Sequence, residues 1–429
     1  MTSRESRSLR VLVLADVCNP EWPSLPIVGY QYAKALAEVA EVHVVTQIRN
    51  LPNLTKAGFG RARVTYLDTE AIAAPIHRVA QVLRRGAETG WTIQMAMDYP
   101  SYVAFELYAW QRFKRDLRRG AFDVVHRITP MSPTLPSPMA RWSPVPFVLG
   151  PLNGNLPWPA QFRAERSRDR EWLSALRNVY KLLPFHRSTY AKSRAILAAF
   201  EHTTSDLPEK VRARSFDFPE VGIDPELFAK PDRPERTRLT VLYAGRLVPF
   251  KLPDVPVLAF ARSELLRKHR LLIVGDGPER ERIERAVAEH ALGDCVEVLG
   301  HRSQPEVAEC MRRADVFAFP SIRELGGGVV VEAMACGMAS VVVDYGGPGT
   351  LIGPDRGVKL PLGDKDQLVE SMRRALERLV ADPPEVRRLG ENAHAHALAH
   401  YAWRGKAQKT LEVYDWVLGR RAAKPDFYA

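Results

Sequence analysis

The sequence has few cysteines and no long hydrophobic run. Its 429 residues include only four cysteines, and their separations match neither a metal-ligand spacing nor a disulfide framework. Scattered thiols favour a reducing, cytoplasmic location. The longest apolar runs, 11–15 and 329–335, are far shorter than the roughly 20 residues of a membrane-spanning helix. We therefore expect a globular chain that binds no metal and no cofactor.

The N-terminal sequence MTSRESRSLRVLVLAD has arginines before an apolar stretch, as a signal peptide would. Asp16 interrupts that stretch after five residues, and no small-residue cleavage site follows. We interpret it as the first core strand.

The positive charge is concentrated in one region. The chain has a net charge of +11, and residues 101–200 hold 16 basic against 6 acidic residues, a net of +10. This region contains FKRDLRR (113–119) and a longer basic stretch, 162–197. The latter mixes arginines with apolar side chains, namely Trp172, Leu173, Leu176, Tyr180, Leu182, Leu183 and Phe185.

Such a segment favours an anionic membrane surface as a partner, at the inner face of the cytoplasmic membrane. The alternative is a solvated, arginine-rich helix whose apolar face packs on its own domain. Nucleic acid is not expected, because no RNA- or DNA-binding signature accompanies the charge.

Short apolar runs alternate with helical patterns throughout the chain. The first half has runs at 9–16, 41–47, 122–128, 146–152 and 195–200, and the second at 239–246, 269–277, 295–300, 314–321 and 339–347. Runs without strict polar alternation are typical of parallel strands that are buried on both faces. We predict an α/β protein with two Rossmann-like, doubly wound parallel-sheet domains that face a central cleft.

The proline-containing segment 221–238 marks the expected boundary between the two domains. We predict an N-terminal domain over 1–220 and a C-terminal domain over 235–405. The amphipathic pattern of 401–421 predicts a last helix, within 406–429, that packs back on the N-terminal domain.

The stretch RELGGGVVVEAMACG, residues 323–337, has two glutamates with seven residues between them and three consecutive glycines. Glycines between a strand and a helix let backbone N–H groups approach an anion. We expect phosphate oxygens at Gly327, Gly328 and Val329, and sugar hydroxyls at the carboxylates. A bare turn with a capping glutamate is the alternative.

A second loop, 242–251, ends a strand with Gly245 and then carries Arg246 and Lys251. A guanidinium and an ammonium group near a strand end can hold a diphosphate. Two solvated surface cations are the alternative.

Together these motifs resemble retaining glycosyltransferases of family 4, which have the GT-B fold. The landmarks run in order over 220–415: VGIDPELF, AGRLVPFK, IVGDGPE, VLG, ADVFAFPSIRE, EAMACG, DYGG and YAW. The first half matches less, through DVVH (123–126) and the first strand.

The resemblance implies a role for each matching residue. Arg246 and Lys251 would hold the donor diphosphate, Glu332 the ribose and Glu324 the transferred sugar, while His301 and Arg302 would flank the base. His126 would lie near the reacting centre.

The resemblance also implies a metal-independent, retaining hexosyl transfer from a nucleotide-diphosphate sugar. We expect UDP first and GDP next, and a glycan or lipid-linked acceptor used in cell-surface polysaccharide or glycolipid synthesis. Asn153, Gly154 and Asn155, after a strand and before Pro–Trp–Pro, suggest a loop that lines the acceptor cleft; a structural turn is equally consistent.

Three other functions are alternatives to glycosyl transfer. An NAD oxidoreductase is disfavoured, because IVGDGPER has Arg280 where the last glycine of the fingerprint should be. A nucleotide-sugar epimerase would need acid–base groups that the sequence does not place together. A partner protein without catalysis would bind the nucleotide sugar and would not transfer the sugar.

Overall fold

The computed structural model describes residues 8–72, 75, 91–163, 165, 179–232 and 237–428, with backbone only for 91–98. The described chain forms two compact units. Unit 1 comprises Met1–Asn155, Glu171–Glu220 and Trp403–Ala429, and unit 2 comprises Leu156–Arg170 and Val221–Ala402, in each case as far as described. Within the described residues, the chain thus changes unit between Asn155 and Leu156, between Glu220 and Val221, and between Ala402 and Trp403.

Unit 1 is built on a seven-stranded sheet with the order β3-β2-β1-β4-β5-β6-β7, and every strand pair is parallel. Its strands are β1 (Arg10–Ala15), β2 (Glu41–Gln47), β3 (Arg63–Leu67), β4 (Val124–Thr129), β5 (Phe147–Leu152), β6 (Ser193–Ala198) and β7 (Ser215–Asp217).

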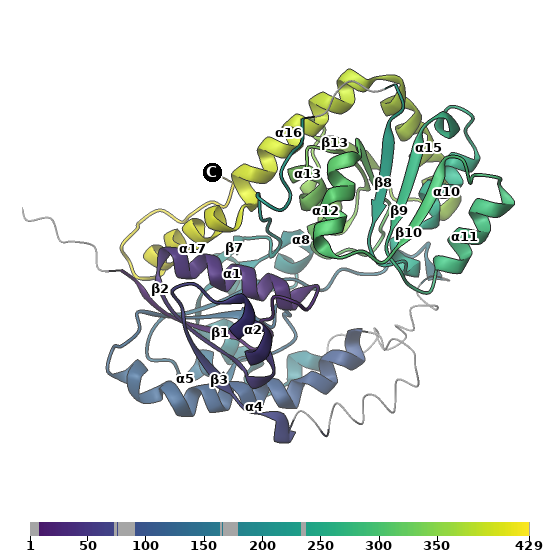
Figure 1. Ribbon diagram of the computed structural model, residues 1–429. Coiled ribbons are helices and arrows are strands. Elements are labelled where there is room, and N and C mark those ends of the chain that lie inside the picture. The colour runs from purple at the N-terminus through teal and green to yellow at the C-terminus, as the bar shows by residue number, and fades with distance from the viewer. Residues whose placement is uncertain are drawn as a thin grey trace, which may run out of the picture. The chain divides into compact units, whose positions relative to one another are not determined.

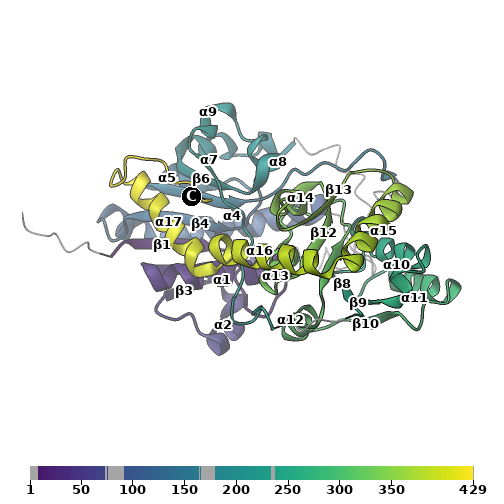
Figure 2. The same ribbon diagram turned by 90° about the horizontal axis from the view of Figure 1, so that it is seen from above.

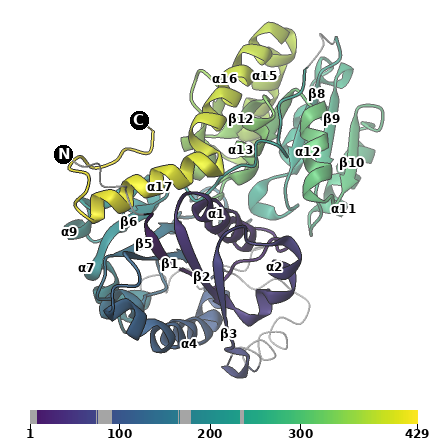
Figure 3. The same ribbon diagram turned by 60° about the vertical axis from the view of Figure 1, so that its left-hand side comes forward.

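The helical elements of unit 1 cover both faces of this sheet. They are α1 (Leu25–Val39), η1 (Ile48–Asn50), α2 (Leu51–Ala57), α4 (Trp91–Arg118), α5 (Pro138–Trp142), η3 (Val179–Leu182), α7 (His186–Lys192), α8 (Phe200–Thr204), α9 (Glu209–Arg212) and α17 (Trp403–Val417). Figure 3 shows α1 and α17 on one face of the sheet and α4 on the other.

Spacing along α4 explains which side of this helix is buried. Tyr102, Phe105, Ala109, Phe113 and Leu117 recur every three or four residues and form one apolar stripe. They pack into the core with side chains from the strands and from α5. The arginines at the end of α4 face water, whereas Glu106 is buried and accepts hydrogen bonds from Ser137 and Met139.

Unit 2 is built on a six-stranded parallel sheet with the order β10-β9-β8-β11-β12-β13. Its strands are β8 (Thr240–Ala244), β9 (Arg270–Val274), β10 (Val296–Gly300), β11 (Val316–Phe319), β12 (Ala339–Val343) and β13 (Gly357–Leu360).

Helices cover both faces of this sheet too. They are η4 (Pro249–Lys251), α10 (Asp254–Ala261), η5 (Leu266–Lys268), α11 (Arg280–Glu289), α12 (Gln304–Arg313), α13 (Gly328–Ala335), α14 (Gly346–Leu351), α15 (Lys365–Ala381) and α16 (Pro383–Tyr401). Figure 2 shows α10, α11 and α15 on one side of the sheet and α13 and α16 on the other.

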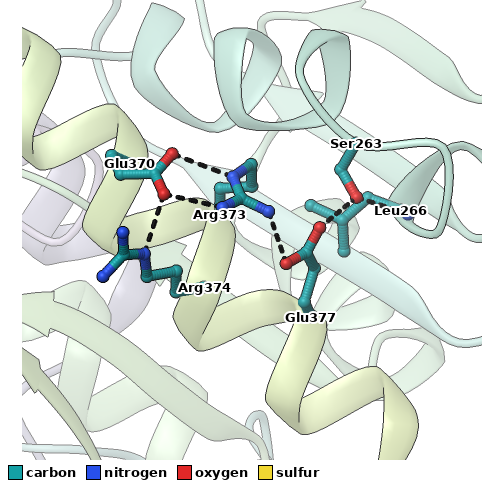
Figure 4. A network of polar contacts seen from close by, with 6 residues as sticks. All are labelled: Ser263, Leu266, Glu370, Arg373, Arg374 and Glu377. Carbon is teal, nitrogen blue, oxygen red and sulfur yellow. Dashed lines mark hydrogen bonds and ion pairs between the residues drawn. The ribbon is translucent and has the colours of Figure 1, made fainter.

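An ionic network joins α15 to the turn before η5 (Figure 4). Arg373 donates to Glu370 on one side and to Glu377 on the other, and Ser263 donates to Glu377 at 2.6 Å. The Ser263 hydroxyl in turn accepts from the Leu266 N–H. The two neighbouring arginines hold the pKa of Glu370 at about 2, well below its usual range. The network ties α15 to the turn at Ser263.

The predicted pair of Rossmann-like parallel sheets is confirmed (Figure 1). Both sheets consist of parallel strands joined by helical crossovers, as the buried apolar runs indicated. The C-terminal helix α17 packs against α1 within unit 1. Among the described residues, no helix combines the length and the apolar character needed to cross a membrane.

Candidate functional site

The predicted residues of unit 2 lie on loops that follow the carboxyl ends of its strands. Arg246 and Lys251 follow β8, His301 and Arg302 follow β10, and the RELGGG stretch follows β11. In a parallel α/β sheet this edge is where ligands bind, because loops and helix N-termini converge there. The structure therefore gathers candidates that the sequence spreads from 246 to 332 along one edge of one sheet.

Lys251 and Glu324 form an ion pair at this edge. The ammonium nitrogen of Lys251 lies 2.8 Å from Oε2 of Glu324, and only 12% of the Lys251 side chain is exposed. The same ammonium group lies 5.2 Å from the centre of the Phe319 ring, a cation–π contact. Because the lysine side chain is held by a carboxylate and a ring, its charge has a defined position beside the strand end.

Gly327, three residues after Glu324, is the N-cap of helix α13. Gly327 has a left-handed backbone conformation, with φ of 76°, that glycine adopts at no steric cost. The first N–H groups of an α-helix have no partner within the helix and carry its positive dipole end. Gly328 and Val329 occupy these first positions, so their N–H groups are suited to an anion close to the Lys251–Glu324 pair.

Glu332 lies one turn further along α13. Part of its surface is reached by water, yet the carboxyl group is surrounded by protein atoms, and this burial raises its pKa to about 7. The amide of Gln304, at the start of α12, lies 3.5 Å from its Oε1. Since Gln304 directly follows the loop that carries His301 and Arg302, this contact brings that loop close to Glu332.

The loop after β9 leaves no room for side chains beside the loop after β8. A Cβ at Gly275 would lie 1.9 Å from the carbonyl oxygen of Gly245, and one at Gly277 would lie 2.5 Å from that of Leu247. The N–H of Leu247 also donates to the carbonyl of Asp276 at 2.9 Å. The glycines of IVGDG therefore let the loop after β9 pack against the backbone that carries Arg246. Arg246 lies exposed on the loop after β8.

The loop after β12 packs against the backbone of Glu324. The N–H of Gly347 donates to the Glu324 carbonyl at 3.0 Å, and a Cβ at Gly346 would lie 2.5 Å from that carbonyl oxygen. Only glycine allows the DYGG motif to pack this closely against the backbone of Glu324.

His126 lies in the core of unit 1. It is fully buried, and burial lowers its pKa to about 4. Its Nε2 lies 2.7 Å from the Gly150 carbonyl, which can only accept, so Nε2 carries the proton and Nδ1 accepts from the Tyr414 hydroxyl at 2.6 Å. These contacts give His126 a structural part in joining β4, β5 and α17, and its catalytic role stays a prediction.

The predicted acceptor loop is also hydrogen-bonded inside unit 1. The Asn153 side chain donates to Glu220, the Gly154 N–H donates to Thr203, and the Asn155 amide donates to Asp206. Asn153 is buried. These bonds support the turn that the sequence offered as the alternative, and a role of Asn153–Asn155 in acceptor binding stays a prediction.

The basic region is described in part. Residues 164 and 166–178, with Trp172, Leu173 and Leu176, lie outside the described residues. At the end of α4 a surface hollow of about 550 Å³ is lined by Gln111, Arg112, Lys114, Arg115, Asp116 and Arg119. Leu182, in the short helix η3, is 84% exposed.

Sequence reasoning missed three contributors to the edge of unit 2: Phe319, Gln304 and Trp158. Phe319 is the last residue of β11, Gln304 opens α12, and Trp158 comes from the first half of the chain. For Phe319, the sequence did offer a signal, namely an aromatic residue at the end of a strand. Within the described part of the chain, no three His, Cys, Asp or Glu side chains come together as metal ligands.

Comparisons with known proteins bear on the family and the fold of this chain. Residues 225–396 match the family model of the glycosyl transferases group 1. A D-inositol 3-phosphate glycosyltransferase of Stackebrandtia nassauensis is 34% identical over 48% of this chain and 49% of its own length. An MMP alpha-(1->4)-mannosyltransferase of Mycolicibacterium hassiacum is 27% identical over 71% of this chain and 73% of its own. The chain thus aligns with about half the length of the first of these relatives.

Solved structures extend the likeness to the whole fold. Sucrose-phosphate synthase from Thermosynechococcus elongatus superposes with a TM-score of 0.67 at 20% identity, over 96% of this chain and all of that one. Anabaena Alr3699/HepE in complex with UDP gives 0.64 at 16% identity, over 95% of this chain and all of that one. At such identities the likeness shows the fold alone. It confirms the predicted GT-B type of architecture. The match to the glycosyl transferases group 1 confirms the resemblance to glycosyltransferases, and membership of family 4 stays a prediction.

Proposed function

We propose that this chain, which belongs to the glycosyl transferases group 1 over residues 225–396, is a retaining, metal-independent hexosyltransferase of family 4. Its donor would be a nucleotide-diphosphate sugar, UDP-linked by first preference and GDP-linked by second. Its acceptor would be a glycan or a lipid-linked sugar, in cell-surface polysaccharide or glycolipid synthesis.

The observation that carries the proposal is the Lys251–Glu324 pair beside the start of α13. A cation, the N–H groups at Gly328 and Val329, and a carboxylate lie together at the ligand-binding edge of a parallel sheet. The cation and the N–H groups can bind a diphosphate, and the carboxylate can accept a hydrogen bond from a sugar hydroxyl. Bound donor would take up the ammonium group with its phosphates and leave Glu324 to accept hydrogen bonds from the sugar.

The remaining residues extend the donor site in both directions. Glu332 would accept hydrogen bonds from the ribose, and the loop of His301 and Arg302 would flank the base, since Gln304 ties that loop to Glu332. Arg246, on the loop shaped by Gly275, would meet the diphosphate opposite Lys251.

In the proposed transfer the bond between the anomeric carbon and the diphosphate oxygen breaks, and the acceptor oxygen bonds to the same face of that carbon. The departing phosphate oxygen gains negative charge and takes the acceptor's proton. Arg246, Lys251 and the N-terminus of α13 stabilise that charge from fixed positions, which is where most of the rate enhancement would arise.

Calorimetric titration with UDP, GDP and ADP, with and without magnesium, tests the donor site. We expect one nucleotide to bind in the micromolar range or tighter without magnesium, and Glu332→Ala to weaken it by about a hundredfold, as for loss of hydrogen bonds to a charged group. Glu289→Ala, an exposed carboxylate at the end of α11, is the matched control and should bind as wild type.

Incubation with the nucleotide sugar then separates the candidate activities. Transfer to an acceptor sugar with retained configuration supports the proposal. Interconversion of the donor sugar without acceptor would make the chain an epimerase, and binding without turnover on any acceptor would make it a partner protein. Failure to bind any of the three nucleotides would overturn the donor site.

We also propose that the basic region meets an anionic membrane that presents the acceptor. The arginines around the hollow at the end of α4 and the exposed Leu182 are the described features that support it. Vesicles with and without phosphatidylglycerol should separate the outcomes in a sedimentation assay. Replacing Arg112, Arg115 and Arg119 by serine should abolish binding to the anionic vesicles only; equal binding to neutral vesicles would contradict the proposal.

A further inference from the structure

Residues Leu156–Trp158 come from the first half of the chain but belong to unit 2. The preceding Asn155 is held in unit 1 by its hydrogen bond to Asp206 at 2.6 Å. Within three residues the chain therefore leaves unit 1 and reaches Trp158, which contacts loops of the candidate donor site.

The Trp158 ring touches the neighbour of each member of the Lys251–Glu324 pair. The guanidinium carbon of Arg323, which directly precedes Glu324, lies 5.2 Å from the centre of the ring. The ring of Phe250, which directly precedes Lys251, meets it edge to face at 6.2 Å and 88°. One side chain therefore contacts both of the loops that supply the ion pair.

Hydrogen bonds join these loops to each other. The carbonyl oxygen of Phe250 accepts from the N–H of Ile322 at 3.0 Å and from the Ser321 hydroxyl at 3.4 Å. Since Phe250 and Ile322 lie one or two residues from Lys251 and Glu324, these bonds set the spacing of the pair. Trp158 contacts Phe250 on one of these loops and Arg323 on the other.

The same short segment is tied to the third loop of the site. The Tyr345 hydroxyl donates to the carbonyl of Pro157 at 2.9 Å. A Cβ at Gly346 would lie 2.8 Å from Leu156, so this glycine also makes room for the segment. Leu156–Trp158 thus contacts all three loops around Glu324.

We propose that Trp158 is a positioning residue for donor binding and transfer. By holding Arg323 and Phe250, it keeps Lys251 and Glu324 at the separation that receives the diphosphate sugar. The inference rests on the proposed function and adds to it a residue from outside the family-matched segment 225–396. Trp158 is only partly buried, so its ring contributes less to the stability of the core than to the order of these loops.

The test compares Trp158→Leu, which removes the aromatic face, with Trp158→Phe, which keeps one. For Trp158→Leu we expect the Kd of the nucleoside diphosphate that binds wild type to rise about tenfold, as for loss of a cation–π and an aromatic contact. The donor KM should rise with it and kcat should fall. Trp158→Phe should stay within about threefold of wild type, given its remaining ring face. Trp142→Leu, a tryptophan that packs on Trp110 and Phe185 in unit 1, is the matched control.

The split between KM and kcat separates positioning from mere packing. A smaller folded fraction would lower apparent kcat and leave KM unchanged, and that result for Trp158→Leu would overturn the inference. Wild-type values of Kd and kcat in Trp158→Leu would also overturn the inference. If Trp158→Leu does not fold, Arg323→Gln removes the cation from the ring and should raise Kd and KM in the same way; unchanged values would overturn the inference. Wild-type protein that binds no nucleotide would instead overturn the proposed function itself.

Discussion

The ammonium group of Lys251 lies 2.8 Å from a carboxylate oxygen of Glu324 at the carboxyl edge of the second sheet. Each residue is the other's partner in the absence of donor. The ion pair holds the ammonium group and the carboxylate in defined positions on their loops. If both were only solvated, each side chain would change rotamer freely. Bound phosphate would compete with Glu324 for the ammonium group, so donor binding and release of the carboxylate are coupled in the proposed site.

Replacing Lys251 by methionine should lower kcat by about 10²–10³-fold, as expected for loss of one charge-stabilising group. The variant keeps an unbranched side chain of similar size and removes the ammonium group, and with it the ion pair and the cation–π contact. Steady-state transfer assays measure the effect, and Lys268→Met, an exposed lysine of η5, is the control. Wild-type turnover in Lys251→Met would exclude Lys251 from the transfer step.

Nucleotide affinity should depend on pH through Glu332, whose pKa burial raises to about 7. Only the ionised carboxylate accepts hydrogen bonds from both ribose hydroxyls, so affinity should rise with pH. About a tenth of a group with this pKa is ionised at pH 6 and about nine tenths at pH 8, which predicts a Kd about tenfold weaker at pH 6. Calorimetry at both values measures it, and in Glu332→Gln this dependence should disappear. Tighter binding at pH 6 would contradict the assignment.

The stability of unit 1 should depend on pH through Lys406. This lysine is fully buried on α17, its ammonium group donates to the Pro219 carbonyl and lies over the rings of Phe218 and Phe427, and burial lowers its pKa to about 7. Between pH 7 and its ordinary pKa near 10.5, the unfolded chain binds a proton that the folded chain does not. Folding therefore becomes more favourable as pH rises through this window.

The measurement for Lys406 is denaturant unfolding of wild type and Lys406→Met at pH 7 and pH 9. The free energy of unfolding of wild type should increase relative to the variant by about 2 kcal/mol over these two units. An equal change in both proteins would show that Lys406 keeps its proton in the folded state throughout.

Gly275→Ala should disrupt the loop that carries Arg246. Its φ is 143°, and the new methyl group would meet the Gly245 carbonyl oxygen at 1.9 Å, so the two loops would have to separate. We expect a loss of unfolding free energy of about 2 kcal/mol or more and weaker nucleotide binding. Gly293→Ala is the matched control, because nothing lies within 4 Å of its added methyl group. Equal stability of the two variants would contradict the steric argument.

The central strands of both sheets were predicted from the sequence, and the edge strands mostly were not. β3, β7 and β13 lie at sheet edges and were missed. An edge strand pairs on one side only and is partly exposed, as every residue of β3 is. It therefore lacks the continuous apolar run by which a buried strand is recognised.

The candidate residues of unit 2 were predictable because their positions follow strand ends in order along the chain. The unit 1 candidates illustrate the limit of this reasoning. A histidine or an asparagine after a strand has the same sequence signal whether it faces a ligand or a neighbour. For His126 and Asn153, the structure shows contacts with Tyr414 and Glu220, which are distant in sequence, and a role of either residue toward a ligand stays a prediction.

The sequence by itself determined the two parallel sheets, the strand-end loops and the match of residues 225–396 to the family model of the glycosyl transferases group 1. These features depend on local patterns: apolar runs, glycines at turns, and charged residues at fixed offsets from a strand end. Only the tertiary structure decided that Lys251 pairs with Glu324, that Glu332 is desolvated, and that Trp158 reaches the loops of unit 2. Each of these depends on contacts between segments far apart in the chain, and such contacts arise from packing, which no local pattern encodes.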